Sequence, residues 1–132
     1  KRKTRTFPAK IKILEGFIFR ASKPAIVGVR VLGGTIKVGM KLMTEDNKSI
    51  GEIKSIRINE DVLKEAIMGS EVAVAISEAV VGRNVKAGDI IYSDLNENDI
   101  KELKNVQLTY EEKEILDEII KIKRKEDPFW GL

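Results

Sequence analysis

Residues 25–43, AIVGVRVLGGTIKVGMKLM, place the strongest constraint on what this chain can fold into. Apolar side chains recur at every second position on both sides of Gly33 and Gly34, beginning with Val27 and Val29, and this spacing is typical of strands with one buried face. Paired glycines readily adopt the positive φ of a tight turn. The stretch therefore predicts two antiparallel strands joined as a hairpin at the glycine pair.

Alternating apolar residues continue along most of the first 95 residues. Further strands are predicted over residues 9–14, 17–20, 50–58 and 71–77 and at the end of 82–93. The isoleucines of 50–58 do not all fall on one face, so we expect a β-bulge near Gly51. Residues 59–69 break the alternation and are interpreted as a helical turn or a loop that dips into the core. Because closure removes unpaired sheet edges, the pattern predicts a mainly β fold, a closed antiparallel six-stranded β-barrel over residues 8–95.

From Asn96 onward the apolar period changes from two to about 3.6, which indicates helices. Asn96 and Asp99 have the spacing of a helix cap, and the stretch 109–112, TYEE, has that of a capping box. Pro128 ends the second helix. Residues 96–132 are therefore predicted to form a two-helix C-terminal extension with an apolar tail.

The first residues, KRKTR, are basic and include no initiating methionine. We interpret residues 1–7 as a linker, or as the end of a preceding linking helix, in a longer polypeptide.

The composition narrows the chemistry that the chain is able to perform. It has no cysteine and no histidine, which removes thiolate metal sites, the cysteine nucleophile and the commonest general base. Its glycines are not followed by the Lys-Ser/Thr pair of a nucleotide-binding loop. We therefore expect no catalytic residues, no metal site and no cofactor in this piece. No apolar run approaches the roughly 20 residues of a membrane span, so we expect a cytoplasmic protein without membrane contacts.

Charge is unevenly distributed along the chain. Residues 1–95 carry 17 basic and 11 acidic side chains, and residues 96–132 carry 7 basic and 10 acidic ones. The predicted barrel is therefore the half suited to phosphate. Its candidate cations lie at strand ends or in loops and are Arg20, Lys23, Arg57, Arg83 and Lys86. For each of them a simply solvated charge remains the alternative.

Two apolar features of the helical part leave alternatives open. The second helix carries a stripe of Ile115, Leu116, Ile119 and Ile120, which either packs in the core or binds a partner. The end of the chain, 129–132, holds the single tryptophan, Trp130, which either docks back on the domain or is offered to a partner.

Three segments, FIFRASKPAIVGVRVLGGTIKVGMKL, IGEIKSIRINEDVLKEAIMGSEVAVAI and GRNVKAGDIIYSDLNENDIKELK, resemble in this order the C-terminal domain, domain IV, of archaeal and eukaryotic translation initiation factor 5B. That family is the counterpart of bacterial initiation factor two. The resemblance implies a barrel like the second domain of elongation factors, followed by two helices. It also implies a non-catalytic domain of a GTPase whose GTP and Mg²⁺ bind outside this chain.

The same resemblance implies partners for this domain. It would bind the methionylated acceptor end of initiator tRNA, receive the C-terminal tail of initiation factor one-A, and act on the ribosome during subunit joining as a monomer. The alternative is an accessory barrel that positions substrate in another translational GTPase or an RNA-modifying enzyme.

Site residues follow by position in the resemblance. The acceptor-end site would consist of Gly28, Val29, Arg57, Ile58, Asn59, Gly69, Glu71 and Val72. Bacterial members have cysteines where this chain has Val29 and Val72, and the difference favours an unformylated methionine. The partner-binding residues would be Ile115, Leu116, Ile119, Ile120 and Trp130.

Overall fold

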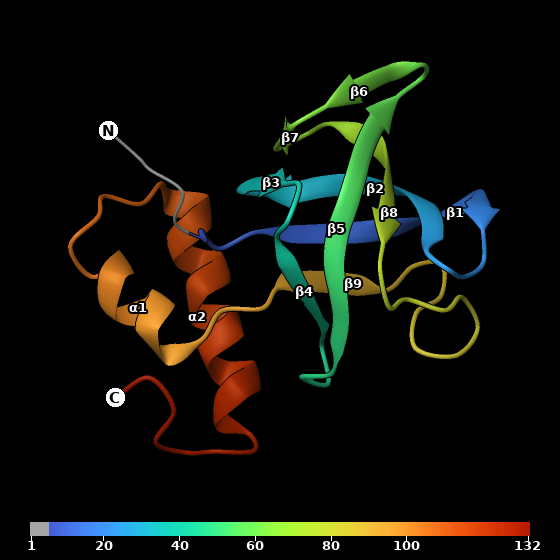
Figure 1. Ribbon diagram of the computed structural model, residues 1–132. Helices are drawn as coiled ribbons and strands as arrows, with labels where there is room; N and C mark the ends of the chain where they lie inside the picture. Colours follow the sequence, from blue (N-terminus) through green and yellow to red (C-terminus); the bar gives the residue numbers. More distant parts are fainter. Residues whose placement is uncertain (1–5) are drawn as a thin grey trace.

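Strands fill the first part of the chain and two helices follow, in the computed structural model, which describes residues 6–132 (Figure 1). The strands are β1 (Lys10–Arg20), β2 (Ala25–Gly33), β3 (Thr35–Lys37), β4 (Lys41–Thr44), β5 (Ser49–Ile58), β6 (Asp61–Leu63), β7 (Glu65–Ile67), β8 (Glu71–Ile76) and β9 (Ile90–Ser93). The helices are α1 (Glu97–Leu103) and α2 (Tyr110–Arg124). Both helices lie on one side of the strands, with α2 beside the sheet.

Six of the strands form a closed ring. Their order is β4-β9-β1-β2-β8-β5, and β4 also pairs with β5. All of these pairings are antiparallel, β6 extends the ring beyond β5, and β3 and β7 form a separate two-stranded sheet. Aliphatic side chains from every strand of the ring, mostly isoleucine and valine, fill its interior. The predicted six-stranded barrel followed by two helices is confirmed.

The predicted hairpin at Gly33 and Gly34 is wrong. Strand β2 lies between β1 and β8, while β3 pairs with β7. The glycines instead permit close packing. A Cβ on Gly33 would lie 2.5 Å from Cδ1 of Ile115 in α2, and one on Gly34, whose φ is +74°, would collide with the carbonyl oxygen of Pro8. The chain therefore leaves the sheet at a point where both the helix and the segment before β1 press against it.

The helical turn or loop predicted over residues 59–69 is also wrong, because this segment forms β6 and β7. Within it Ala66 is buried, whereas Val62 and Ile67 are well exposed. The alternation is weak because these short strands protrude from the barrel and pack on it with little of their surface (Figure 1). Backbone pairing with β5 and β3 defines them.

Two bulges shape the long strands. The one predicted near Gly51 is confirmed, since the register of β5 against β4 gains one residue between Ser49 and Glu52 and Gly51 has a φ of +87°. The other lies in β1, which was predicted as two runs, 9–14 and 17–20. Residues 14–17 of β1 form this bulge, opposite Gly28 of β2.

The helices form a second core with one end of the barrel. Both predicted caps are present, with Asn96 and Asp99 closing a capping box at α1 and Thr109 and Glu112 closing one at α2. Apolar side chains of both helices pack against the barrel end. Phe7, at the end of the stretch 1–7 interpreted as a linker, is buried in this core; residues 1–5 lie outside the described part of the chain.

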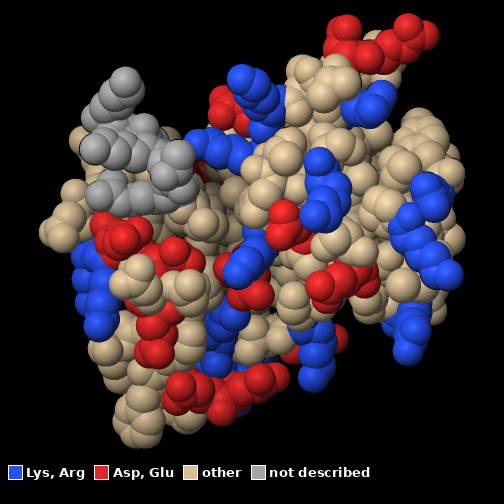
Figure 2. All heavy atoms as spheres, in the orientation of Figure 1, with Lys and Arg blue, Asp and Glu red and all other residues tan. Residues whose placement is uncertain are grey.

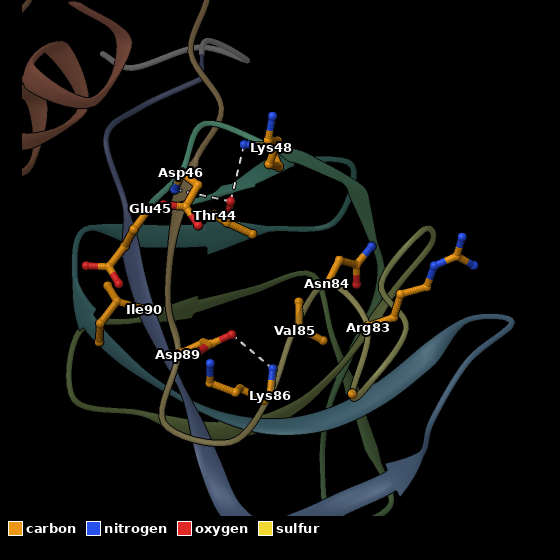
Figure 3. Close-up of a pocket in the computed structure, with 11 residues that line it drawn as sticks. Thr44, Glu45, Asp46, Lys48, Arg83, Asn84, Val85, Lys86, Asp89 and Ile90 are labelled. Carbon is orange, nitrogen blue, oxygen red and sulfur yellow. Dashed lines mark hydrogen bonds between the residues drawn. The ribbon is translucent and has the colours of Figure 1, made fainter. Parts of the chain in front are cut away.

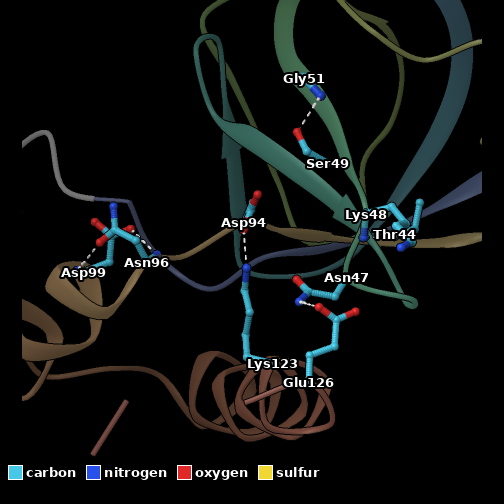
Figure 4. Close-up of polar contacts among 10 residues, drawn as sticks. All are labelled: Thr44, Asn47, Lys48, Ser49, Gly51, Asp94, Asn96, Asp99, Lys123 and Glu126. Carbon is cyan, nitrogen blue, oxygen red and sulfur yellow. Dashed lines mark hydrogen bonds and ion pairs between the residues drawn. The ribbon is translucent and has the colours of Figure 1, made fainter. Parts of the chain in front are cut away.

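Polar contacts tie α2 to the barrel. Lys10 Nζ and the Tyr92 hydroxyl donate to Glu118 Oε1 at 2.9 and 2.6 Å. Figure 4 shows a second link, in which Lys123 Nζ donates to Asp94 Oδ1 at 2.6 Å. Burial, and then the hydrogen bond to Glu118, raise the pKa of Tyr92. Burial alone would raise the pKa of Glu118, but the hydrogen bonds from Tyr92 and Lys10 outweigh it and leave this pKa below its usual value.

The C-terminal tail docks on the domain, the first of the two alternatives for Trp130. Arg124 Nε donates to the carbonyl oxygen of Trp130 at 2.8 Å, and Lys123 Nζ lies 5.8 Å from the centroid of its ring. The backbone N–H of Gly131 donates to Glu97 of α1 at 2.9 Å. Within the described residues, neither helix has the length and apolarity needed to cross a membrane.

Candidate nucleic-acid interface

A cleft of about 210 Å³ opens on the outer face of the barrel, where β1, β2, β5 and β8 lie side by side. Its lining residues are Leu14, Phe17, Phe19, Gly28, Arg57, Ile58, Asn59, Glu71, Val72 and Ala73. The structure thus gathers, in one place, six residues that the sequence assigns to a single site, namely Gly28, Arg57, Ile58, Asn59, Glu71 and Val72. These residues come from three different strands and the turn after β5.

Small residues make the floor of this cleft. Gly28 of β2 pairs with Ala73 of β8, and Ala73 pairs on its other side with Arg57 of β5, so the three lie in one row across the sheet. Side chains in such a row project from the same face. A glycine and an alanine there leave a depression between larger side chains, and Arg57 forms one of its edges.

The opposite edge is aromatic. The β1 bulge places Phe17 directly over Gly28, where an added Cβ would lie 2.6 Å from the Phe17 Cβ. Phe17 and Phe19 remain 52% and 63% exposed, unusually high values for phenylalanine. Exposed aromatic rings beside a cationic groove are the recurring means by which proteins stack unpaired nucleobases.

Charge is arranged at two ends of the cleft. Arg57 is exposed and forms no ion pair with the other described residues. Glu71 accepts a hydrogen bond from Arg30 Nη1 through its Oε2 at 3.3 Å, and both side chains are about half exposed. The guanidinium of Arg57 is therefore free to bind an anion, and one carboxylate oxygen of Glu71 is free to accept a further hydrogen bond.

Two predicted residues do not line the cleft. Val29 is fully buried and pairs with Val72, so its side chain belongs to the barrel interior. Gly69 is exposed with a φ of +92° and lies in the turn between β7 and β8. The positions where bacterial relatives would have cysteines are thus neighbouring core positions, although Val72 also reaches the edge of the cleft.

Four lining residues were absent from the sequence prediction, namely Leu14, Phe17, Phe19 and Ala73. The segment FIFR carries a signal that was available: two phenylalanines at alternate positions, followed by an arginine, in a strand otherwise rich in charge. The position of the bulge, which turns Phe17 back over β2, depends on tertiary structure.

The other predicted cations lie elsewhere. Arg20 is the last residue of β1, and Lys23 lies in the turn between β1 and β2; Arg20 Nε donates to the Ser22 carbonyl oxygen of this turn at 2.9 Å. Figure 2 shows basic side chains along this end of the barrel, while acidic ones are more numerous over the helices. Arg83 and Lys86 line a second cleft. The structure therefore does not bring Arg20, Lys23, Arg83 and Lys86 together in one site.

This second cleft, of about 490 Å³, lies between the β4–β5 turn and the loop before β9 (Figure 3). It mixes three cations with three anions, namely Lys48, Arg83 and Lys86 with Glu45, Asp46 and Asp89. The smaller cleft is the better candidate for a nucleic acid, because the exposed rings of Phe17 and Phe19 line it, whereas no aromatic residue is among those that line the larger cleft. Among residues 6–132, no three carboxylates are grouped in a way that would hold a metal ion.

The predicted partner-binding residues separate into two sets. Ile115 and Ile119 are buried in the second core, which corrects the expectation that their side chains are available to a partner. Leu116, Ile120 and Trp130 are only partly buried. The centre of the helical stripe, Ile115 and Ile119, is therefore part of the core, and its flank, Leu116 and Ile120, is part of the surface.

A closed antiparallel barrel with an aromatic surface cleft that includes an exposed arginine, extended by two helices, is the architecture of an accessory β-barrel domain of the kind found in translation factors. The family described as elongation factor Tu domain 4 matches residues 7–92, and the chain belongs to this family. Within it the chain corresponds to domain IV, the C-terminal region, of archaeal initiation factor IF-2/aIF5B, a region outside the GTPase core.

Individual relatives support this placement. The chain is 52% identical over 129 residues to a protein of Methanopyrus kandleri and 50% identical over 124 residues to one of Thermoplasma volcanium, both named probable translation initiation factor IF-2. These matches cover 95% and 94% of the chain and 21% of each relative. The solved structure of GDP-bound aIF5B from Aeropyrum pernix superposes with a TM-score of 0.90 at 35% identity, over 96% of this chain and 22% of that one. The chain thus spans about a fifth of the length of these relatives.

Proposed function

We propose that this chain is the part of a translation initiation factor that binds the methionylated acceptor end of initiator tRNA. The observation that supports it most is the cleft itself, where six of the eight residues expected at an acceptor-end site meet two exposed phenylalanines. In the whole protein, GTP and Mg²⁺ would bind outside this chain, and the domain would act on the ribosome, in the cytoplasm, as subunits join.

The size and lining of the cleft support a terminal group as its ligand. A volume of about 210 Å³ corresponds to about seven water molecules in the liquid. That space suits one base or one aminoacyl group, and it is far too small for a duplex. Phe17, Phe19 and Ile58 offer apolar and aromatic surface to such a group, while Arg57 is placed for the adjoining phosphate.

The helices supply a second proposed interface, for the C-terminal tail of initiation factor one-A. The partly buried residues Leu116, Ile120 and Trp130 offer apolar surface beside the basic last turn of α2. The basic turn suits an acidic, extended peptide with apolar anchors. The domain would remain a monomer.

The alternative, a substrate-positioning barrel of another translational GTPase or an RNA-modifying enzyme, receives less support. The relatives described above are named as initiation factors. The same cleft would serve either role, so the identity of the RNA decides between them.

Titration of the chain with initiator tRNA tests the main proposal. We expect methionylated tRNA to bind more tightly than deacylated tRNA, and the affinity to fall as salt rises because phosphate contacts release counterions. Arg57→Ala should weaken binding about tenfold, as expected for one charge-assisted contact of about 1.5 kcal/mol. Arg83→Ala, in the mixed-charge cleft, is the matched control. Equal affinity for both tRNAs would remove the acceptor-end proposal.

Leu116→Asp tests the helical interface. A charge at this partly buried position should abolish binding of the factor one-A tail, because desolvating an unpaired carboxylate opposes docking. Ile67→Asp places the same charge on an exposed residue of β7 and should leave binding intact. Circular dichroism establishes that both variants are folded. Unchanged tail binding by folded Leu116→Asp would argue against this surface.

A further inference from the structure

The two charged residues that line the cleft lie at different positions along it. Arg57 lies at the row formed with Ala73 and Gly28, whereas Glu71 stands two residues further along β8 on the same face. Two residues of a strand span about 7 Å. One end of the cleft is therefore cationic and the other carries a carboxylate, with the two phenylalanines beside the space between them.

Only one oxygen of the Glu71 carboxylate accepts a hydrogen bond from another described residue. Arg30 of β2 pairs with Glu71 in register and donates to its Oε2 at 3.3 Å. Among the described residues nothing else donates to this carboxylate. A half-exposed carboxylate that is fixed by one arginine and open on its other oxygen is suited to bind a small cation or ammonium group that enters the cleft.

An aminoacylated tRNA end has the matching polarity. Its terminal nucleotide carries a phosphate on one side of the ribose, and the ester on the other side carries the α-amino group of the amino acid. Near neutral pH the phosphate is an anion and a substantial fraction of the free amine is protonated. We propose, resting on the function proposed above, that Glu71 binds the free α-ammonium group of the aminoacyl ester and thereby selects a tRNA whose amino group is unmodified.

The surroundings of Glu71 are consistent with this role. The charged side chains that face it are Arg30 from β2 and Arg57 from β5, the two strands that pair with β8. Lys12 of β1 pairs with Arg30 on the side away from Glu71. Glu71 neutralises the positive charge of Arg30, and the phosphate of the ligand would neutralise that of Arg57. The second carboxylate oxygen of Glu71 is then the hydrogen-bond acceptor nearest the amine. An N-acylated amine is uncharged, so contact with the Glu71 carboxylate would add little to its binding free energy.

The experiment compares three forms of the same initiator tRNA: methionylated, Nα-acetyl-methionylated and deacylated. With the unmodified chain we expect methionylated tRNA to bind about three- to tenfold more tightly than the acetylated form, the range for a partly exposed charge-assisted contact. Glu71→Gln should abolish this preference, because it should lower the affinity for methionylated tRNA more than the affinity for the acetylated form. Glu65→Gln on β7, which does not line the cleft, is the matched control and should retain the preference.

A pH series separates charge from the bulk of the acetyl group. Because the ammonium form is the one bound, affinity for methionylated tRNA should fall as the pH rises from 6.0 through the amine pKa of about 7.7. Acetylated tRNA should show no such fall, and neither should Glu71→Gln with either tRNA.

The possible failures are distinguishable. If methionylated and acetylated tRNA bind equally and both bind better than deacylated tRNA, the role of Glu71 is wrong and the acceptor-end function stands. If Glu71→Gln still prefers methionylated to acetylated tRNA, a group other than Glu71 binds the amine and the proposal is wrong. If none of the three forms is distinguished, the proposed function itself fails, and this inference fails with it.

Discussion

At the scale of single residues, the cleft depends on one missing Cβ. Gly28 has an ordinary negative φ, so its backbone does not require glycine. The requirement comes from Phe17, whose Cβ occupies the space that a side chain at position 28 would need. The absence of a side chain at position 28 therefore allows Phe17 to lie close over the sheet.

Gly28→Ala should displace Phe17 and damage the cleft. The added methyl group would lie 2.6 Å from the Phe17 Cβ, and relief of such overpacking costs about 1–3 kcal/mol. We expect a lower free energy of unfolding, measured in urea, together with weaker tRNA binding. Phe17→Gly removes the contacted atom, so Gly28→Ala should cost much less in that background. Equal costs in both backgrounds would show that Phe17 is not the obstacle.

At the scale of elements, local and long-range determinants divide clearly. Helices α1 and α2 begin where their capping boxes place them, because each cap satisfies backbone donors within three residues. Strands β6 and β7 instead form where the alternation fails. Strand β6 pairs with β5 across a two-residue turn, where Ile58 lies opposite Asp61, whereas β7 pairs with β3, which is distant in the sequence.

Thr109→Ala tests the contribution of the cap to α2. The Thr109 hydroxyl accepts from the backbone N–H of Glu112 at 3.1 Å, and the Glu112 carboxylate accepts from the backbone N–H of Thr109 at 2.9 Å. Loss of the hydroxyl should cost about 1 kcal/mol and lower the melting temperature by about 3–5 °C. Thr109→Ser preserves the acceptor and should melt close to the unmodified chain. A melting temperature unchanged in Thr109→Ala would mean that packing alone fixes the start of α2.

At the scale of the whole molecule, the barrel and the helices behave as one body because two kinds of contact join them. The second core buries apolar side chains from both, and the contacts of Glu118 and Lys123 add polar links at its edge. Gly33 permits the close approach of Ile115 on which this packing depends.

The links to Glu118 should make the stability of this junction depend on pH. The pKa of Glu118 lies below its usual value of 4.5 in the folded state, so its contribution is present above about pH 4.5 and is lost as the pH falls through the folded pKa. The pKa of Tyr92 is raised above its usual value of 10.0, so its contribution is full below pH 10 and is lost as the pH rises further.

Glu118→Gln should therefore flatten the acid side of the stability profile. At pH 7 we expect a loss of about 0.5–1 kcal/mol, small because Glu118 is partly exposed. Between pH 5 and pH 3 the unmodified chain should lose more stability than Glu118→Gln, as measured by urea unfolding. Asp117→Asn, a neutralisation on the neighbouring exposed position, is the control. Parallel profiles for Glu118→Gln and the unmodified chain would contradict the assigned role.

The sequence by itself determined the features that depend on near neighbours. Alternation at Val27 and Val29 and the period of α2 follow from side-chain geometry along one segment, and the caps at Asn96 and Thr109 follow from hydrogen bonds three residues apart. Most of the cleft, from Gly28 to Glu71, was predictable through the family resemblance, whereas composition and spacing alone identified only Arg57 as a candidate cation.

Only the tertiary structure decided which segments meet. Gly33 and Gly34 predicted a hairpin because the backbone of glycine can adopt the φ angles of a tight turn. In the structure Ile115 and Pro8 fill the space beside these glycines, and β2 pairs with β1 and β8. Phe17 became part of the cleft because the β1 bulge carries it over Gly28. Pairing and close packing depend on atoms far apart in the sequence, and no local pattern encodes where those atoms will lie.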